Sequence, residues 1–260
     1  MKGIVLLDLD ETLHYSAKQK HKAWQHILNF FGFEWDASNA NPQHELDGIE
    51  PMLWPERGLP PHEFLRQLLR NLGLGLKTFD RSRAVNDIST EEQLFKFLQK
   101  EWSDSLIRSA HEMATEEVPG AVNMVKKIFA KDYHMGVITQ APTEYAEIIL
   151  SKLGLLNREN PYINAIVGSE KVARPKPDPE GLIIATKLVW LDQFPDSQEE
   201  PPKALLFIGD SQSDELASAN LGIPFLMIDR ILAEGRIILP DGDTIQLDIP
   251  PIRGEKEIWN

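Results

Sequence analysis

The chain has 260 residues, of which 42% are hydrophobic, and this is enough for one large domain or for a core domain with an insertion. Its formal net charge of −13 makes nucleic acid and anionic membrane surfaces poor partners. The chain contains no cysteine, which excludes disulfides, thiolate catalysis and cysteine-bound zinc, so we expect a cytoplasmic protein.

An unbroken apolar run opens the chain, and we predict a strand from Gly3 to Asp10. Such a run is typical of a strand buried on both faces of a parallel sheet. It is too short for a membrane span, and its acidic end is unlike a signal peptide. Asp8 and Asp10 are two residues apart, so in extended geometry their carboxylates point the same way. Their repulsion and lost hydration favour a bound Mg²⁺, although a solvated loop is the alternative for this motif alone.

Residues 16–116 show helical periodicity and no pattern of a buried strand. Apolar residues at positions 24, 27, 28 and 31 share one face of a first predicted helix. A proline-rich loop over residues 39–61 follows, and its Arg57 is predicted to be an ordinary surface residue rather than a contact for a second substrate anion. A second helix is predicted from Pro61, and Thr90 with Gln93 forms a capping box ahead of a third.

The second half of the chain alternates between buried strands and helices. The predicted strands are Met135–Ile138, Tyr162–Val167, Ala204–Ile208 and Phe225–Ile228. With the first strand, they predict an α/β fold with a doubly wound parallel sheet, interrupted after its first strand by the helical block. We therefore predict a core domain over residues 1–15 and 117–260 and a helical domain over 16–116. The tail, residues 231–260, contains a predicted hairpin around Asp241 and Gly242.

Polar side chains gather at the predicted carboxyl ends of these strands, where ligands bind in such sheets. They are Asp8, Asp10, Thr139, Lys176, Asp210 and Asp214. Four carboxylates require a cation, while the hydroxyl group and the ammonium group can bind an anion. The set therefore predicts a phosphate site beside a metal ion.

Four motifs in this chain resemble those of the haloacid dehalogenase superfamily of aspartyl phosphohydrolases. They are Asp8-Leu9-Asp10-Glu11-Thr12, Thr139 after Gly136-Val137-Ile138, Lys176 in Lys-Pro-Asp-Pro, and Gly209-Asp210-Ser211-Gln212-Ser213-Asp214. They occur in the family's order, and the resemblance covers about residues 1–15 and 117–229. It implies a Rossmann-like core in which residues 16–116 form a helical cap that closes over the site and excludes water.

The resemblance implies catalytic roles for four residues. Asp8 would be the nucleophile that forms an aspartyl-phosphate. Asp10 would be the general acid that protonates the leaving oxygen and then the general base for the hydrolytic water. Thr139 would hydrogen-bond the phosphoryl group, and Lys176 would neutralise the charge of the phosphate and the nucleophile.

The resemblance also implies a Mg²⁺ site. Asp8, the backbone carbonyl of Asp10 and Asp210 would bind the ion, and Asp214 would act through water or by positioning Lys176. Two residues depart from the family pattern. Glu11 stands where many capped relatives have glycine, which affects the local hinge, and Gln140 follows Thr139 where asparagine is commoner.

We therefore expect a Mg²⁺-dependent phosphatase that acts on a small phosphorylated metabolite. A phosphomutase or a phosphonate-cleaving enzyme is the alternative, and the latter needs a cap lysine such as Lys18, Lys20 or Lys22 to form an imine. A phospho-receiver module also surrounds a phosphorylated aspartate with acids, threonine and lysine, but it needs no helical cap. A silent binding protein is disfavoured because the motif residues are intact, and the oligomeric state is not readable from the sequence.

Overall fold

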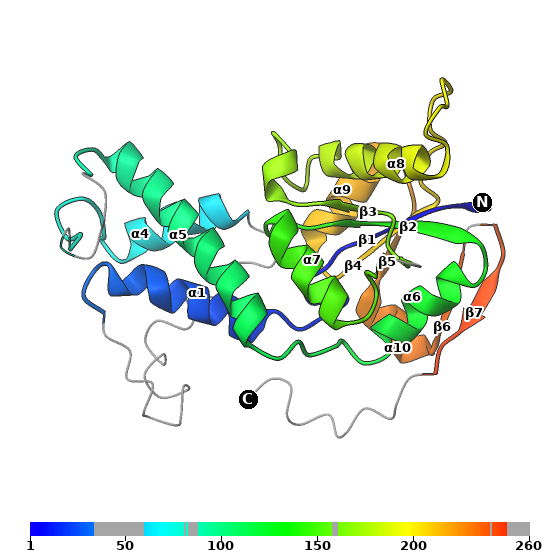
Figure 1. The fold of residues 1–260 in the computed structure, drawn as a ribbon, viewed down its shortest axis with the longest axis horizontal. Coiled ribbons are helices and arrows are strands. Elements are labelled where there is room, and N and C mark those ends of the chain that lie inside the picture. The colour runs from blue at the N-terminus through cyan, green and yellow to red at the C-terminus, as the bar shows by residue number, and fades with distance from the viewer. Residues whose placement is uncertain (34–59, 81, 83–87, 158–160, 240, 249–260) are drawn as a thin grey trace. The chain divides into compact units, whose positions relative to one another are not determined.

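The computed structural model describes residues 1–33, 60–80, 82, 88–157, 161–239 and 241–248 (Figure 1). The predicted loop over residues 39–61, with Arg57, lies outside them except for Pro60 and Pro61. The chain divides into two compact units, one formed by Met1–Ser16 with Thr115–Asn260 and the other by Ala17–Ala114.

The first unit is built on a five-stranded sheet with the order β3-β2-β1-β4-β5. The strands are β1 (Gly3–Leu7), β2 (Tyr133–Ile138), β3 (Ala165–Val167), β4 (Leu206–Gly209) and β5 (Phe225–Met227). All four neighbouring pairs are parallel. From β1 the chain proceeds to β2 and β3 on one side, then returns to β4 and β5 on the other. This confirms the predicted doubly wound α/β fold and places the topological switch point between β1 and β4.

Helices cover both faces of this sheet, which explains why β1 is apolar throughout. They are α6 (Ala121–Phe129), α7 (Thr143–Lys152), α8 (Glu180–Gln193), α9 (Gln212–Leu221) and α10 (Ile228–Glu234), with a short helix η2 (Ser169–Lys171). Figure 1 shows α8 and α9 on one side of the sheet and α6 and α10 on the other. Ile4 and Leu6 pack in the cluster with α8, where a Cβ on Gly136 would lie 3.1 Å from Val189 Cγ2. Every side chain from Ile4 to Leu7 is fully buried.

The first strand is shorter than predicted, because it ends at Leu7 and the chain then turns. Asp8 still donates its backbone N–H to Ile208 O at 2.8 Å. Two residues later the backbone leaves the sheet, since the amides of Thr12 and Leu13 bond to Leu9 O at 3.4 and 2.8 Å. The prediction that Asp8 and Asp10 lie in one extended segment is therefore wrong, and a turn positions Asp10.

The second unit is helical in its described residues. It contains α1 (Ala17–Asn29), α4 (Pro61–Asn71) and α5 (Glu91–Glu112). Trp24 of α1 lies 4.5 Å from the Phe64 ring and 5.3 Å from the Trp102 ring between centroids, so aromatic packing joins the three helices. The predicted capping box is confirmed, because Thr90 accepts a hydrogen bond from Gln93 N at 3.2 Å and Gln93 accepts one from Thr90 N.

The tail adds a two-stranded antiparallel ribbon, β6 (Arg236–Ile238) and β7 (Thr244–Gln246), at the predicted hairpin. Tyr133 donates its hydroxyl hydrogen to Asp241, and Lys2 donates to Asp243 Oδ2 at 2.7 Å. Tyr133 and Gly3 begin their strands, so the ribbon is attached at the amino ends of the strands. The residues at the carboxyl ends of β1 and β4 lie at the opposite edge of the sheet.

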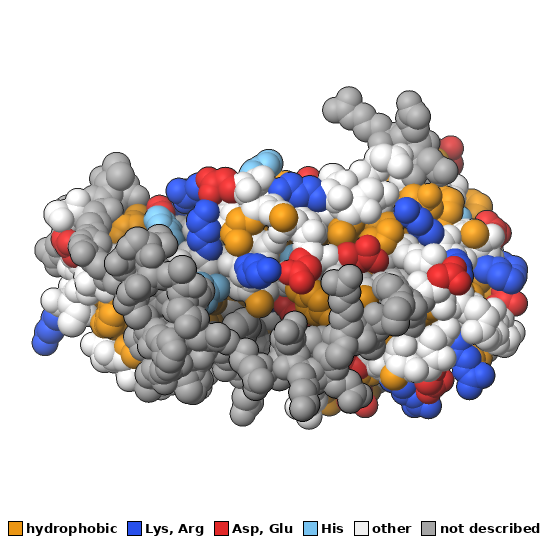
Figure 2. Space-filling model, turned by 90° about the horizontal axis from the view of Figure 1, so that it is seen from below, with side chains coloured by type: hydrophobic (Ala, Val, Ile, Leu, Met, Phe, Trp, Pro, Cys, Tyr) orange, Lys and Arg blue, Asp and Glu red, His pale blue; other side chains and the backbone are white. Residues whose placement is uncertain are grey.

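The surface of the described residues carries charges of both signs. Figure 2 shows acidic and basic side chains interspersed on one face, with no extended basic patch among the described residues there. None of the helices in the described ranges combines the length and apolar character that crossing a membrane would demand.

Candidate active site

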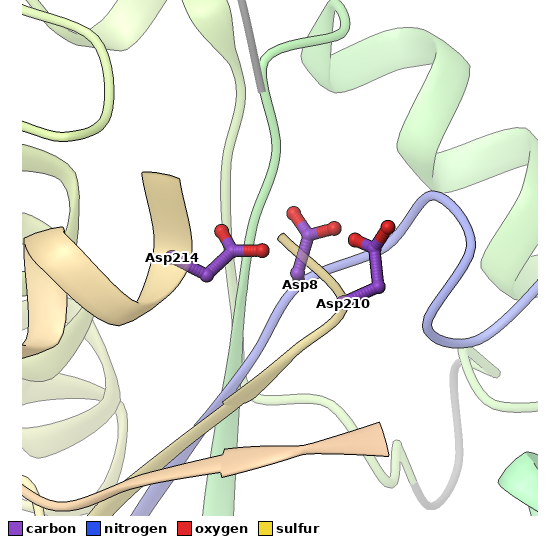
Figure 3. A group of neighbouring side chains, drawn as sticks. All are labelled: Asp8, Asp210 and Asp214. Atoms are coloured by element: carbon purple, nitrogen blue, oxygen red, sulfur yellow. The ribbon is translucent and has the colours of Figure 1, made fainter. Parts of the chain in front are cut away.

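Three carboxylates meet beyond the carboxyl ends of the central strands. Asp8 follows β1, Asp210 follows β4, and Asp214 lies in the first turn of α9. One carboxylate oxygen of each residue lies within 4.8 Å of the others, and Figure 3 shows the three side chains turned toward one another. Asp214 is fully buried, Asp8 is 6% exposed and Asp210 is half-buried. Clustered hard oxygen donors fit Mg²⁺, which prefers carboxylate ligands and retains waters.

Lys176 supplies the positive charge that faces these carboxylates. Its Nζ donates to Asp8 Oδ1 and to Asp214 Oδ1, each at 2.6 Å, and its side chain is buried. Burial alone would lower the pKa of Lys176, but Asp214 and Asp8 outweigh burial and raise it, so the group remains charged. Burial raises the pKa of Asp8 well above its ordinary value; Lys176 opposes this effect, while Asp214 and Asp210 add to it. One ammonium group does not offset three carboxylates, so the site favours a further cation.

Asp214 is held from both sides. Its Oδ2 accepts hydrogen bonds from Ser211 N at 3.1 Å and from Ser211 Oγ at 2.6 Å, while its Oδ1 accepts from Lys176. Ser211 is the N-cap of α9 and Asp214 is the third residue of the helix, and the two form a capping box. A Cβ on Gly209 would lie 2.6 Å from Asp214 Oδ2, so this position requires glycine. The hydrogen bonds from Ser211 and the close approach of Gly209 thus hold Asp214 where it accepts the hydrogen bond from Lys176.

Thr139 ends β2 at the same edge of the sheet. It is 4% exposed, and its backbone N–H donates to Val167 O at 3.0 Å. Its hydroxyl oxygen accepts a hydrogen bond from Ala141 N at 3.0 Å and still carries its own hydrogen as a donor. Gln140 Nε2 donates to Lys176 O at 3.2 Å, which ties the turn after β2 to the loop that carries Lys176.

Asp10 does not belong to the group of three converging carboxylates. Its Oδ1 lies 2.9 Å from His14 Nε2 and 3.4 Å from the hydroxyl of Tyr145, and these two groups lie 3.1 Å apart. The sequence analysis identified neither His14 nor Tyr145 as a partner of Asp10. The sequence offered one signal for His14, which is a polar residue directly after the apolar Leu13 of the first motif. In the structure this residue is completely buried.

The turn between Asp8 and His14 is built around Glu11. Its φ of 59° is in the left-handed region, where glycine is favoured. The Glu11 side chain compensates, since Oε1 accepts hydrogen bonds from Ser16 N at 2.9 Å and Ser16 Oγ at 2.8 Å. The buried hydroxyl of Thr12, the next residue, has no hydrogen-bond partner in the described residues.

Comparison with known proteins agrees with this arrangement. The chain is 25% identical over 245 residues to phosphoglycolate phosphatase 1 of Pseudomonas aeruginosa, covering 94% of this chain and 76% of that protein. It is 26% identical over 246 residues to a phosphoglycolate phosphatase of Pseudomonas fluorescens, with the same two coverages.

Solved structures show the same fold. A hydrolase from Pseudomonas syringae superposes with a TM-score of 0.58 at 21% identity, over 86% of this chain and 83% of that chain. CbbY from Rhodobacter sphaeroides in complex with phosphate gives a TM-score of 0.58 at 16% identity, over 87% of this chain and 86% of that chain. The family model of haloacid dehalogenase-like hydrolases matches residues 62–228. Because that match covers more than half of the chain, the protein belongs to the haloacid dehalogenase-like hydrolases, and the predicted family and hydrolase class are confirmed.

Proposed function

We propose that this hydrolase is a Mg²⁺-dependent phosphatase that cleaves a small phosphate monoester through an aspartyl-phosphate on Asp8. The observation that carries the proposal is that buried Asp8 accepts a hydrogen bond from the ammonium group of Lys176 while one of its oxygens lies within 4.8 Å of carboxylate oxygens of Asp210 and Asp214. A buried carboxylate in such surroundings is costly for stability, and groups of this kind cluster at functional sites. The relatives named phosphoglycolate phosphatases support phosphate ester hydrolysis.

The metal ion would be held by Asp8, Asp210 and the backbone carbonyl of Asp10. Asp214 would stay outside direct contact, because its two oxygens are engaged by Lys176 and Ser211. When bound, Mg²⁺ shields negative charge and polarises phosphoryl oxygens.

Hydrolysis would proceed in two steps on the residues of this chain. In the first, an Asp8 oxygen attacks phosphorus while Asp10 protonates the departing oxygen. In the second, Asp10 takes a proton from water, which attacks phosphorus and frees Asp8. Lys176 and the hydroxyl of Thr139 would bind the phosphoryl oxygens throughout.

The substrate is proposed from the same chemistry. A compact phosphorylated carboxylic acid such as phosphoglycolate is the first candidate, because the relatives carry that name. Sugar phosphates and nucleotides are the other classes for a screening panel. The helical unit, Ala17–Ala114, is inserted between β1 and α6, and we propose that it is a cap that selects the leaving group. Lys22, one candidate for imine formation, is paired with Glu112 at 2.6 Å, which does not favour the phosphonate-cleaving alternative.

A direct test uses p-nitrophenyl phosphate with Mg²⁺ and with a chelator. Wild-type protein is expected to release p-nitrophenolate only with the metal, and Asp8→Asn and Asp8→Ala are expected to reduce turnover to background. Asp248→Asn, an exposed acidic residue of the tail, is the matched control and should retain activity. Turnover in both Asp8 variants would refute the proposal.

A further inference from the structure

The proposed proton donor, Asp10, is bonded to two side chains that the mechanism above does not use. His14 Nε2 lies 2.9 Å from Asp10 Oδ1, and the Tyr145 hydroxyl lies 3.4 Å from the same oxygen. The Asp10 side chain is 12% exposed, whereas His14 and Tyr145 are fully buried. Burying two polar side chains beside a carboxylate is costly unless the three groups form hydrogen bonds with one another.

The buried nitrogen on the far side of the imidazole indicates which atom of His14 carries the hydrogen. Nδ1 is buried and has no hydrogen-bond partner in the described part of the chain. An orphaned N–H is rarer in proteins than an acceptor without a partner. The hydrogen therefore belongs on Nε2, and His14 donates it to Asp10 Oδ1.

Tyr145 is the second donor to the same oxygen. Its hydroxyl lies 3.1 Å from His14 Nε2, which already carries a hydrogen and cannot accept another, so the acceptor of the Tyr145 hydroxyl is Asp10 Oδ1 at 3.4 Å. The His14 ring and the Tyr145 ring lie 5.8 Å apart between centroids, so the two side chains pack next to each other. Two donors thus converge on one oxygen of Asp10.

The two donors come from separate elements. His14 is fixed by its backbone, since Glu11 N donates to His14 O at 2.8 Å and Val118 N donates to the preceding Leu13 O at 3.2 Å. Tyr145 lies in the first turn of α7, directly after the turn that carries Thr139. The network therefore orients the Asp10 carboxyl group relative to the end of β2.

We propose that His14 and Tyr145 are positioning residues that hold Asp10 Oδ1, so that Oδ2 exchanges the proton with the leaving oxygen and then with water. In the first step, Oδ2–H breaks as the leaving oxygen gains the hydrogen and the electron pair of its bond to phosphorus. In the second, Oδ2 regains a hydrogen from the attacking water. The inference rests on the proposed phosphatase function and deepens it.

The test compares two phosphate esters that differ in their need for a proton donor. p-Nitrophenolate leaves as a stabilised anion, whereas the alkoxide of glycerol phosphate must be protonated as it leaves. The parameter is kcat/KM, because it reports on the steps up to departure of the leaving group. His14→Leu and Tyr145→Phe are expected to lower kcat/KM for glycerol phosphate by about 10-fold or more, and by less than about 3-fold for p-nitrophenyl phosphate.

Two variants make the comparison specific. His14→Gln places an amide N–H close to the position of Nε2 and should restore most of the rate on glycerol phosphate. Tyr133→Phe removes another buried tyrosine hydroxyl, at the opposite edge of the sheet, and should leave the ratio of the two rates unchanged. Thermal melting of each variant with Mg²⁺ verifies that it is folded.

The rates on the two esters distinguish the positioning role of His14 and Tyr145 from the phosphatase function itself. An equal fall in kcat/KM on both esters, or no fall on either, overturns the positioning role while the phosphatase function stands. A wild-type protein that cleaves neither ester nor any ester of the panel overturns the proposed function, and the inference with it.

Discussion

The ammonium nitrogen of Lys176 lies 2.6 Å from Asp8 Oδ1, although the two residues are 168 positions apart in the chain. The contact is buried and shared with Asp214, so folding of the first unit brings one positive charge to a group of negative charges. The buried cluster of charges is costly for stability, and its carboxylates and ammonium group are the groups that the proposed function assigns to a cation and a phosphate.

Removal of the Lys176 charge is expected to destabilise the protein. Lys176→Met leaves two buried carboxylates without their partner, and breaking buried ion pairs in this way costs about 3–5 kcal/mol. Urea denaturation at neutral pH without Mg²⁺ should show this loss, and the loss should shrink in acid as Asp8 gains a proton. Lys187→Met, on the exposed face of α8, is the control and should change little. Unchanged stability of Lys176→Met would contradict the buried-pair interpretation.

Stabilisation by Mg²⁺ is expected to increase with pH. The pKa of Asp8 is raised above its ordinary value of 3.8 in the folded protein, first by burial. Between the ordinary and the raised value the metal-free folded state binds more protons than the unfolded state, so this group lowers stability as pH rises. Mg²⁺ requires the ionised carboxylate, and its binding releases the proton. The shift in melting temperature caused by Mg²⁺ should therefore grow through that window.

Calorimetry in buffers of different ionisation enthalpy measures the released proton directly. Asp210→Asn should weaken Mg²⁺ binding and reduce the melting shift. A melting shift that is independent of pH, with no proton released, would be inconsistent with Asp8 as a metal ligand.

Gly209 is expected to tolerate no side chain. In Gly209→Ala the new Cβ would lie 2.6 Å from Asp214 Oδ2, and that carboxylate cannot move without losing Ser211 or Lys176. Overpacking of this kind costs about 1–3 kcal/mol, and phosphatase activity should fall with it. Gly75→Ala is the control, because its Cβ would meet only the flexible end of Glu91, at 3.2 Å. Equal stability of the two variants would show that Asp214 is not confined.

Glu11→Gly tests the unusual residue of the first motif. Glycine would relieve about 1–2 kcal/mol of left-handed strain. It would also remove the acceptor of two Ser16 hydrogen bonds, each of which contributes about 1.5–3 kcal/mol when one partner is charged. We expect a net loss in the free energy of unfolding, and a smaller loss for Glu11→Gln, which keeps a side-chain acceptor. A stabilised Glu11→Gly protein would mean that strain dominates at this turn.

The sequence predicted most of what depends on periodicity and order along the chain. The alternation of apolar strands and helices predicted the parallel sheet, and the strand ends predicted that Asp8 and Asp210 would meet. The contacts that the sequence did not predict depend on tertiary packing. Tyr145 meets Asp10 only because α7 packs beside the turn after β1, and a helical face alone does not distinguish a tyrosine that donates a hydrogen bond from an apolar core residue.

The local backbone conformation after β1 was also not predicted from the sequence. Extended spacing placed Asp8 and Asp10 together, but β1 ends at Leu7 and the left-handed conformation of Glu11 redirects the chain. A positive φ at a glutamate is not readable from its own propensity. It becomes understandable once Ser16 is seen to compensate for the strain through two hydrogen bonds.

In the proposed mechanism, Asp8 carries the phosphoryl group during turnover. The most direct test of this role is to mix the Mg²⁺-loaded enzyme with ³²P-labelled substrate, quench in acid within the first turnover, and map the labelled peptide. We expect label on Asp8 that hydroxylamine releases, and no label in Asp8→Asn. Turnover that leaves Asp8 unlabelled, or label on another residue, would rule out Asp8 as the nucleophile.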